Sequence, residues 1–267
     1  MELAGGLVVF GATRVWKSLD VRGILICALG GLIAVETRSY AGWFLVTAAV
    51  LVLLHASLRK GLDRPLRAMP LIYLVIAAVF VATPVLLQAS SKSKLQQLQV
   101  SQNANATGAG EASTSGSNGA NLALEKVDYS TRGAILKNLP KRVRDVVLRP
   151  YPWQLANTSQ RFGAVGTLFA YAVLLLLIRY AWLSRGRVLP KVAPLLYPLL
   201  FLLIAYSLSA GNAGTAFRYR SHLVVLAVGV MTILRRQVML SRTSAVASSG
   251  KSETDAAQVQ HAVPSAV

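Results

Sequence analysis

The chain is poor in charged residues and in cysteine. Asp, Glu, Lys and Arg make up only 14% of its 267 residues, and Cys27 is the single cysteine. One cysteine excludes an internal disulfide framework and a metal site built on several cysteines. The sequence also lacks a P-loop, a His-Glu-x-x-His pair and a Gly-x-Ser-x-Gly turn, the local patterns of phosphate-loop enzymes, zinc proteases and serine hydrolases. We therefore expect neither a metal ion nor a cofactor.

Long apolar runs make up much of the sequence. Hydrophobic residues make up 54% of the chain, and they gather in blocks of roughly 15–22 residues, about what an α-helix needs to cross ~30 Å of hydrocarbon. The runs do not alternate apolar with polar residues, which argues against a membrane β-barrel. The sequence therefore predicts an all-α polytopic membrane bundle with about six transmembrane helices. The six predicted spans are residues 23–36, 41–57, 69–88, 162–180, 192–210 and 222–234.

The spans divide the chain into two membrane parts, a long loop and a tail. Residues 1–88 hold three spans, and residues 162–236 hold the other three. An apolar segment at residues 3–12 is too short to cross a membrane, and we expect it to be the end of a helix that begins in a longer protein. Residues 237–267 are small and polar, which predicts a disordered cytoplasmic tail.

The segment between the two membrane parts, residues 89–161, is predicted to be one long extracytoplasmic loop. Its first part, 89–122, is rich in Ser, Asn, Gly and Gln and is predicted to be disordered. In 123–161, apolar residues recur at helical spacing between basic ones, which predicts a basic helix on the membrane surface, interrupted at Pro140. The proline-rich turn that follows carries residues expected to anchor the chain at the interface, namely Arg149, Tyr151 and Trp153.

The distribution of positive charge predicts an orientation. A net charge of +18 would suit a nucleic-acid partner, but 15 of the 28 Lys and Arg residues fall in the short segments that six spans place on one side. The short loops of the other side hold three, Arg38, Arg218 and Arg220. Because Lys and Arg gather on the cytoplasmic side, both termini are predicted to be cytoplasmic. We expect membrane lipids as partners, no nucleic acid, and a bacterial inner-membrane location.

Arginines stand at the outer starts of three predicted spans. A helix start carries a partial positive charge that disfavours a neighbouring cation, so free backbone N–H groups together with an arginine indicate a site for an anion. A planar guanidinium suits bidentate binding of phosphate. Alternatively, each arginine reaches lipid phosphates independently of the others. The predicted phosphate contacts are Arg38, Arg161, Asn212, Arg218 and Arg220.

Two residues are candidates for acid and base chemistry near these arginines. Glu36 is the only carboxylate at the outer edge of a span, and His222 lies one turn from Arg218. A glutamate there can serve as a base toward a sugar hydroxyl, and a histidine can transfer protons near neutral pH. The alternatives are a structural ion pair for Glu36 and an interfacial role for His222. No other carboxylate and no lysine lies inside a predicted span, which disfavours an ion-coupled transporter.

Two segments resemble a known group of proteins. The run 149–154 before one span and the run 211–220 before the last span are similar to the C-terminal part of bacterial polytopic membrane proteins of surface-polysaccharide and exopolysaccharide assembly. These are O-antigen polymerase or ligase proteins and multi-span glycosyltransferases that use lipid-linked sugars. The resemblance implies a polyprenyl-pyrophosphate-linked glycan on the outer face, with Arg218 and Arg220 as phosphate contacts. It also implies other polysaccharide-assembly proteins as partners.

The resemblance leaves catalysis open. The long outer loop bearing a histidine that ligases carry, and the early acidic motif of the glycosyltransferases, have no counterpart in the sequence. A glycan polymerase or glycosyltransferase is therefore one hypothesis. A non-catalytic membrane scaffold, whose basic segment 137–149 docks onto anionic lipid or polymer, is the second, and a transporter is the third.

Overall fold

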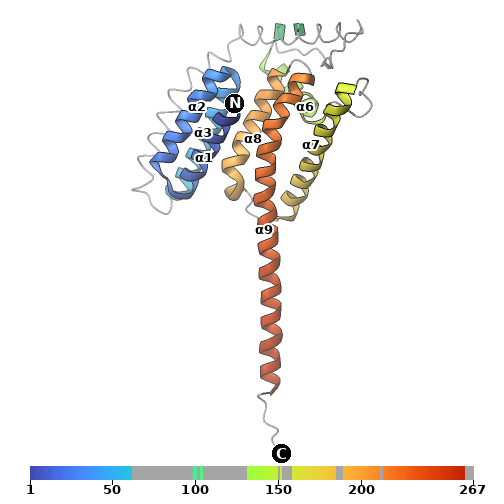
Figure 1. Ribbon diagram of the computed structural model, residues 1–267. Helices are drawn as coiled ribbons and strands as arrows, with labels where there is room; N and C mark the ends of the chain where they lie inside the picture. Colours follow the sequence, from blue (N-terminus) through green and yellow to red (C-terminus); the bar gives the residue numbers. More distant parts are fainter. Residues whose placement is uncertain are drawn as a thin grey trace, which may run out of the picture.

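The computed structural model is all-helical in the part of the chain that it describes, residues 1–61, 99–100, 103–104, 131–149, 151, 158–184, 189–210 and 213–261. Seven helices lie within these ranges (Figure 1). They are α1 (Glu2–Ser18), α2 (Val21–Thr37), α3 (Ser39–Gly61), α6 (Arg132–Leu148), α7 (Thr158–Leu183), α8 (Leu189–Ser209) and α9 (Ala213–His261).

Four of these helices are long and apolar enough to cross a membrane. They contain the stretches Ser39–Lys60, Ala164–Leu183, Leu189–Ser209 and Thr215–Ser241, which confirms four of the six predicted spans. The predicted span 23–36 is α2, a helix of 17 residues that falls just short of the usual spanning length of about 20. The remaining predicted span, 69–88, lies outside the described residues.

The N-terminal apolar segment is part of helix α1, which packs within the bundle. Helix α1 has 17 residues and packs along α2, with further contacts to α3 and α8. The helix extends past the apolar run to Ser18, and Leu19 ends it in the left-handed conformation, with φ of 53°. The apolar residues 3–12 are thus part of a longer helix, which polar residues complete as far as Ser18.

Close backbone contact joins α1 to α2. A Cβ atom added to Gly11 would lie 2.5 Å from the carbonyl oxygen of Gly23 and 2.7 Å from the amide nitrogen of Cys27. One added to Gly30 would lie 2.9 Å from the carbonyl oxygen of Ala4. Small residues at such positions let two helices approach through their backbones, as in many membrane helix pairs. The thiol of Cys27, buried in this contact, donates a hydrogen bond to the carbonyl of Val8 at 3.2 Å.

Helices α8 and α9 pack together in the centre of the bundle, with α1, α2 and α3 on the α8 side and α7 against α9 (Figure 1). Met1 and the start of α9 lie at one end of the bundle, which we call the outer end; the C-terminal part of α9 projects beyond the opposite, inner end (Figure 1). Both termini were predicted to lie on one side of the membrane, whereas the start of α1 and the end of α9 lie at opposite ends of the bundle (Figure 1). Because α1 runs the length of the bundle antiparallel to α2, Met1 lies at the end opposite to His261.

Aromatic and basic side chains close the inner end of this packing. The indole of Trp16 donates a hydrogen bond to the carbonyl of Pro190 at 2.9 Å, which ties α1 to the start of α8. The ring of His55 meets Trp16 edge-on with centroids 4.9 Å apart, and its Nδ1 lies 3.0 Å from the hydroxyl of Tyr197. The guanidinium of Arg59 covers the indole of Trp16 at 5.3 Å. These contacts fix the register of α1 against α3 and α8.

Helix α9 continues well past its membrane-length stretch. It runs to His261 and has 49 residues in all, so it covers most of the segment 237–267 that was predicted to be disordered. Once a helix is nucleated, each added residue costs little, and Pro264 is the first proline after the span. The arginines Arg235 and Arg236 lie exposed where α9 leaves the bundle.

The short connection between α1 and α2 is held by an ion pair, which gives a pH prediction. Asp20 caps α2 by accepting the backbone N–H of Arg22, and its carboxylate lies 2.6 Å from the guanidinium of Arg14. The cap and then the guanidinium lower the pKa of Asp20. A lowered pKa stabilises the fold above the unfolded-state pKa, and the contribution is lost as the pH falls below about 4.

We therefore expect the Asp20→Asn variant to unfold at a lower temperature than the wild type at neutral pH. Thermal melting of the detergent-solubilised protein measures this difference. The gap should shrink as the pH is lowered into the range where Asp20 takes up a proton. An unchanged gap at acidic pH would show that the side chain acts through its shape and not through its charge.

Candidate functional site

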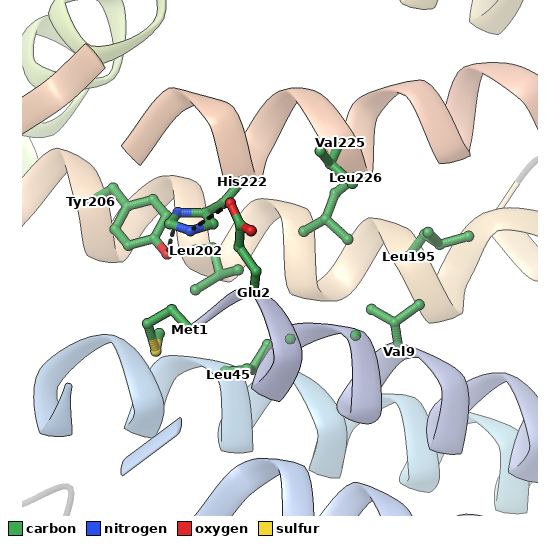
Figure 2. A pocket seen from close by; sticks show the side chains of 12 residues that line it. Met1, Glu2, Val9, Leu45, Leu195, Leu202, Tyr206, His222, Val225 and Leu226 are labelled. Atoms are coloured by element: carbon green, nitrogen blue, oxygen red, sulfur yellow. Dashed lines mark hydrogen bonds and ion pairs between the residues drawn. The ribbon is translucent and has the colours of Figure 1, made fainter. Parts of the chain in front are cut away.

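An apolar cavity of about 300 Å³ lies between α1, α3, α8 and α9 (Figure 2). This volume is near the lower end of the range for small-molecule sites, roughly 300–1,000 Å³. Its walls are mainly aliphatic, and its polar side chains belong to Glu2, Tyr206 and His222. The other lining residues are Met1, Gly5, Gly6, Val9, Leu45, Leu195, Leu202, Val225 and Leu226.

The three polar side chains form a connected row at the outer end of the cavity. The Nε2 atom of His222 lies 3.6 Å from a carboxylate oxygen of Glu2, which links α9 to α1. The Nδ1 atom of His222 lies 3.3 Å from the hydroxyl of Tyr206 on α8. Figure 2 shows Glu2, His222 and Tyr206 pointing toward one another. One end of the cavity is therefore polar, and protons can pass there between a carboxylate, an imidazole and a phenol.

An aromatic stack connects this row to Arg38. The rings of Tyr206 and Tyr219 are stacked, with centroids 4.4 Å apart and an angle of 16° between their planes. The guanidinium of Arg38 lies 4.9 Å from the centroid of Tyr219, a favourable distance for a cation over an aromatic face. Arg38 is the residue at which α2 ends, immediately before Ser39 begins α3. The stack therefore holds one cation beside the polar end of the cavity.

The segment predicted to be a loop carrying two arginines is helical from Ala213 onward. Successive side chains of an α-helix point about 100° apart, so Arg218, Tyr219 and Arg220 face three directions. Arg218 is exposed, Tyr219 meets the aromatic stack, and Arg220 is buried. Residues two apart on a helix do not face each other. The predicted pocket that joins Arg38, Arg218 and Arg220 is therefore not assembled.

Arg220 binds protein groups at the end of α6. Its Nε donates to the carbonyl of Val146 at 3.0 Å, and one terminal nitrogen donates to the hydroxyl of Thr167 at 2.9 Å. The other terminal nitrogen donates to the carbonyl of Arg149. A helix leaves its last carbonyls without partners in the helix and carries a partial negative charge there. Arg220, only 4% exposed, donates hydrogen bonds to carbonyls at this helix end and places a positive charge beside its partial negative charge. We call this contact the α6 socket.

Helix α6 confirms the helix that was predicted around Pro140, although it packs more deeply than expected. It runs without interruption through Pro140 and contacts α7, α8 and α9. Val146 and Asp145 are buried, and the carboxylate of Asp145 lies 3.4 Å from the guanidinium of Arg149. The hydroxyl of Tyr171 on α7 donates to the carbonyl of Leu148. The helix is thus held at the outer end by its own C-terminal turn.

The other predicted site residues are dispersed. Glu36 lies exposed in the last turn of α2, two residues from Arg38, whose guanidinium turns to Tyr219. Arg161 is exposed in the first turn of α7, on the side of α9 away from α1 to α3 (Figure 1). Tyr151 lies 5.9 Å from the guanidinium of Arg149, measured to its ring centroid. Asn212 and Trp153 lie outside the described residues.

His222 and Arg38 were predicted from the sequence as site residues, but the residues that contact them were not. Glu2 and Tyr206 come from helices 16 or more residues away in sequence from His222, so nothing local marks them as its neighbours. One signal was present in the sequence. The pair Gly5 and Gly6 interrupts an otherwise helix-favouring run, and glycine in a helix costs about 1 kcal/mol relative to alanine. Such a pair indicates that space is needed on that face.

Comparisons with known proteins found no relative of this chain: no family model, no curated protein and no solved structure matches it. Within the described ranges, no group of three or more His, Cys, Asp or Glu side chains gathers closely enough to hold a metal ion.

Proposed function

We propose that the protein belongs to the machinery of bacterial cell-surface polysaccharide assembly and binds a polyprenyl-pyrophosphate-linked glycan at the outer end of the bundle. One observation carries the proposal: an apolar cavity between α1 and three membrane-length helices has its polar end at Glu2, Tyr206 and His222, with Arg38 held beside it through Tyr219. An anionic headgroup on an apolar chain matches this combination. The outer end is assigned to the extracytoplasmic face, in keeping with the positive charge that gathers at the inner end.

Two arginines remain suited to the phosphates. The guanidinium of Arg38 is exposed and lies 4.9 Å from the centroid of the Tyr219 ring, and a planar guanidinium suits bidentate binding of phosphate. Arg218 is exposed and lies four residues before His222, so the two share one face of α9. Arg220 is not part of this proposal, because its donors are used in the α6 socket. The proposed phosphate contacts are thus Arg38 and Arg218.

His222 is the proposed proton-transfer group if the bound glycan is also extended or transferred. Its Nε2 faces the carboxylate of Glu2, and its Nδ1 faces the hydroxyl of Tyr206. A carboxylate fixes the orientation of an imidazole and stabilises its charged form after it has removed a proton from an acceptor hydroxyl. Glu36 lies apart from this row, so the proposal gives the base role to His222.

The test is to replace Arg38 and Arg218 together by Gln and to measure binding of a polyprenyl diphosphate to the protein in phosphatidylcholine nanodiscs. Each charged hydrogen bond contributes about 1.5–3 kcal/mol, so the double variant should lose at least about tenfold in affinity. Arg179→Gln, an exposed arginine on α7, is the matched control and should bind normally.

Equal affinity of the double variant and the Arg179→Gln control would end the proposal. In cells, the double variant should lower the amount or chain length of surface polymer at normal protein level. A His222→Gln variant that binds the diphosphate normally but makes no polymer would indicate catalysis. The same variant with normal polymer would leave binding as the role of the site.

A scaffold role is the second candidate, and the exposed side of α6 favours it. Lys137, Lys141 and Arg144 are exposed along one stripe of that helix, at the spacing that places residues three or four apart on one face. Such a stripe suits anionic lipid headgroups or an anionic polymer. Replacing all three by Gln should impair a scaffold, which would be indifferent to the Arg38 and Arg218 substitutions. The opposite pattern favours the glycan site.

A further inference from the structure

Two glycines hollow out the cavity on the α1 side. A Cβ atom added to Gly5 or Gly6 would meet no other atom within 4 Å, and both residues line the cavity. Gly11, on the same helix, is different, because its Cβ would collide with the backbone of α2. Close helix packing therefore explains Gly11 but explains neither Gly5 nor Gly6. What these two glycines provide is room, at a cost in helix stability of about 1 kcal/mol each.

The cavity opens on the side of the bundle between α1 and α9. Val225 lines it and is 69% exposed, and Glu2 at its polar end is 78% exposed. In Figure 2, Leu226 extends from α9 toward α1, where Val9 is labelled. Val225 lies within the membrane-length stretch Thr215–Ser241, so we expect hydrocarbon as the medium at this level. An apolar cavity that opens at this level favours an alkyl chain and not water.

We propose that this cavity holds the isoprenoid chain of the same ligand whose phosphates bind Arg38 and Arg218. The inference rests on the proposed function and adds to it the place of the chain. The isoprenoid units next to the phosphate lie between Gly5 and Gly6 on one side and Leu226 on the other. The contact between Glu2 and His222 closes the outer end above it. The phosphate is then positioned beside Tyr206, where Arg38 is held.

The test uses an isoprenoid diphosphate that carries a photoreactive diazirine in its chain, added to the protein in phosphatidylcholine nanodiscs. In the wild type, cross-links should concentrate on α1 near Val9 and on α9 near Leu226. Gly6→Leu places its Cβ where no other atom lies within 4 Å, and its side chain should occupy part of the cavity and lower these cross-links at least about fivefold relative to wild type. Labelling of Leu175, 67% exposed on α7, measures contact with bulk lipid and should not change.

Gly5→Leu is a second cavity-filling variant, and Gly133→Leu on α6, where a Cβ would meet only the hydroxyl of Thr131 at 4.0 Å, is the matched control. Continued protection of the Cys27 thiol from a maleimide reagent shows that each variant keeps the α1–α2 contact. Cavity cross-links that persist in both filled variants overturn the inference, as do cross-links no stronger than those of Leu175.

The failures of the two proposals are distinguishable. If the Arg38 and Arg218 double variant binds the diphosphate as the wild type does, the phosphate contacts are wrong, whatever the cavity labels show. If that variant loses affinity while the filled variants label normally, the phosphate contacts stand and the chain lies elsewhere. If the double variant loses affinity and the filled variants lose their labels, both proposals hold.

Discussion

The Arg220→Gln variant is expected to release α6 from the outer end of the bundle. Arg220 contributes donors to two carbonyls at the end of α6 and to the hydroxyl of Thr167 on α7. Glutamine is shorter, has no charge and cannot reach three acceptors from the same backbone position. Hydrogen bonds from a charged donor contribute about 1.5–3 kcal/mol each, and the acceptors left behind are buried. We expect a loss of about 3 kcal/mol or more in the free energy that holds α6.

Hydrogen exchange of the α6 amides, 132–148, measures this loss in detergent or nanodiscs. In the variant these amides should exchange at least about a hundredfold faster, while those of α8 should exchange as in the wild type. Arg218→Gln is the control two residues away: an exposed arginine contributes within about 0.5 kcal/mol to stability. Equal protection of α6 in the Arg220→Gln and Arg218→Gln variants would contradict the α6 socket.

Substitution by alanine at two glycines of α1 is expected to change the stability in opposite directions, and this is the second prediction with a large effect. Gly11→Ala places a Cβ 2.5 Å from the carbonyl oxygen of Gly23, so α1 and α2 must separate. Overpacking of this kind costs about 1–3 kcal/mol, and sometimes more. Gly5→Ala adds the same methyl group where nothing lies within 4 Å. There it should stabilise the helix by up to about 1 kcal/mol.

The single cysteine reports this difference directly. Cys27 is buried, and its sulfur lies 2.9 Å from where the Gly11 Cβ would be. Separation of the helices should therefore speed its reaction with a maleimide in Gly11→Ala, and thermal melting should move to lower temperature. Gly5→Ala should keep the thiol protected and melt at or above the wild-type temperature. Two variants that shift in the same direction would show that the α1–α2 contact is looser than described.

The membrane-length helices could be predicted from the sequence because their long apolar runs are a local property of the chain. Each of the four confirmed spans is a continuous run whose composition alone suits hydrocarbon. The helix around Pro140 was readable for a similar reason, since its apolar residues repeat at helical spacing. The same local reasoning failed at 211–220, which was predicted to be a loop and where the helix begins at Ala213.

The candidate site could be predicted only in part from the sequence. Arg38 and His222 stood out because charge and imidazole are rare beside apolar runs. Their roles relative to Arg220 did not follow from the sequence, because Arg218 and Arg220 look alike there. A rotation of about 200° along the helix sends Arg218 outward and Arg220 into the α6 socket. The partners that separate them, Thr167 and Val146, are distant along the chain.

The sequence by itself determined that this chain is helical, that it carries membrane-length helices, and that cations stand where those helices begin. Composition and spacing decide these properties, because each helix satisfies its own backbone groups within one stretch of chain. Only the tertiary structure decided that Glu2, Tyr206 and His222 meet, that a cavity lies beside Gly5 and Gly6, and that Arg220 is structural. Those properties depend on which helices pack together and at what rotation, and side chains from different helices set both.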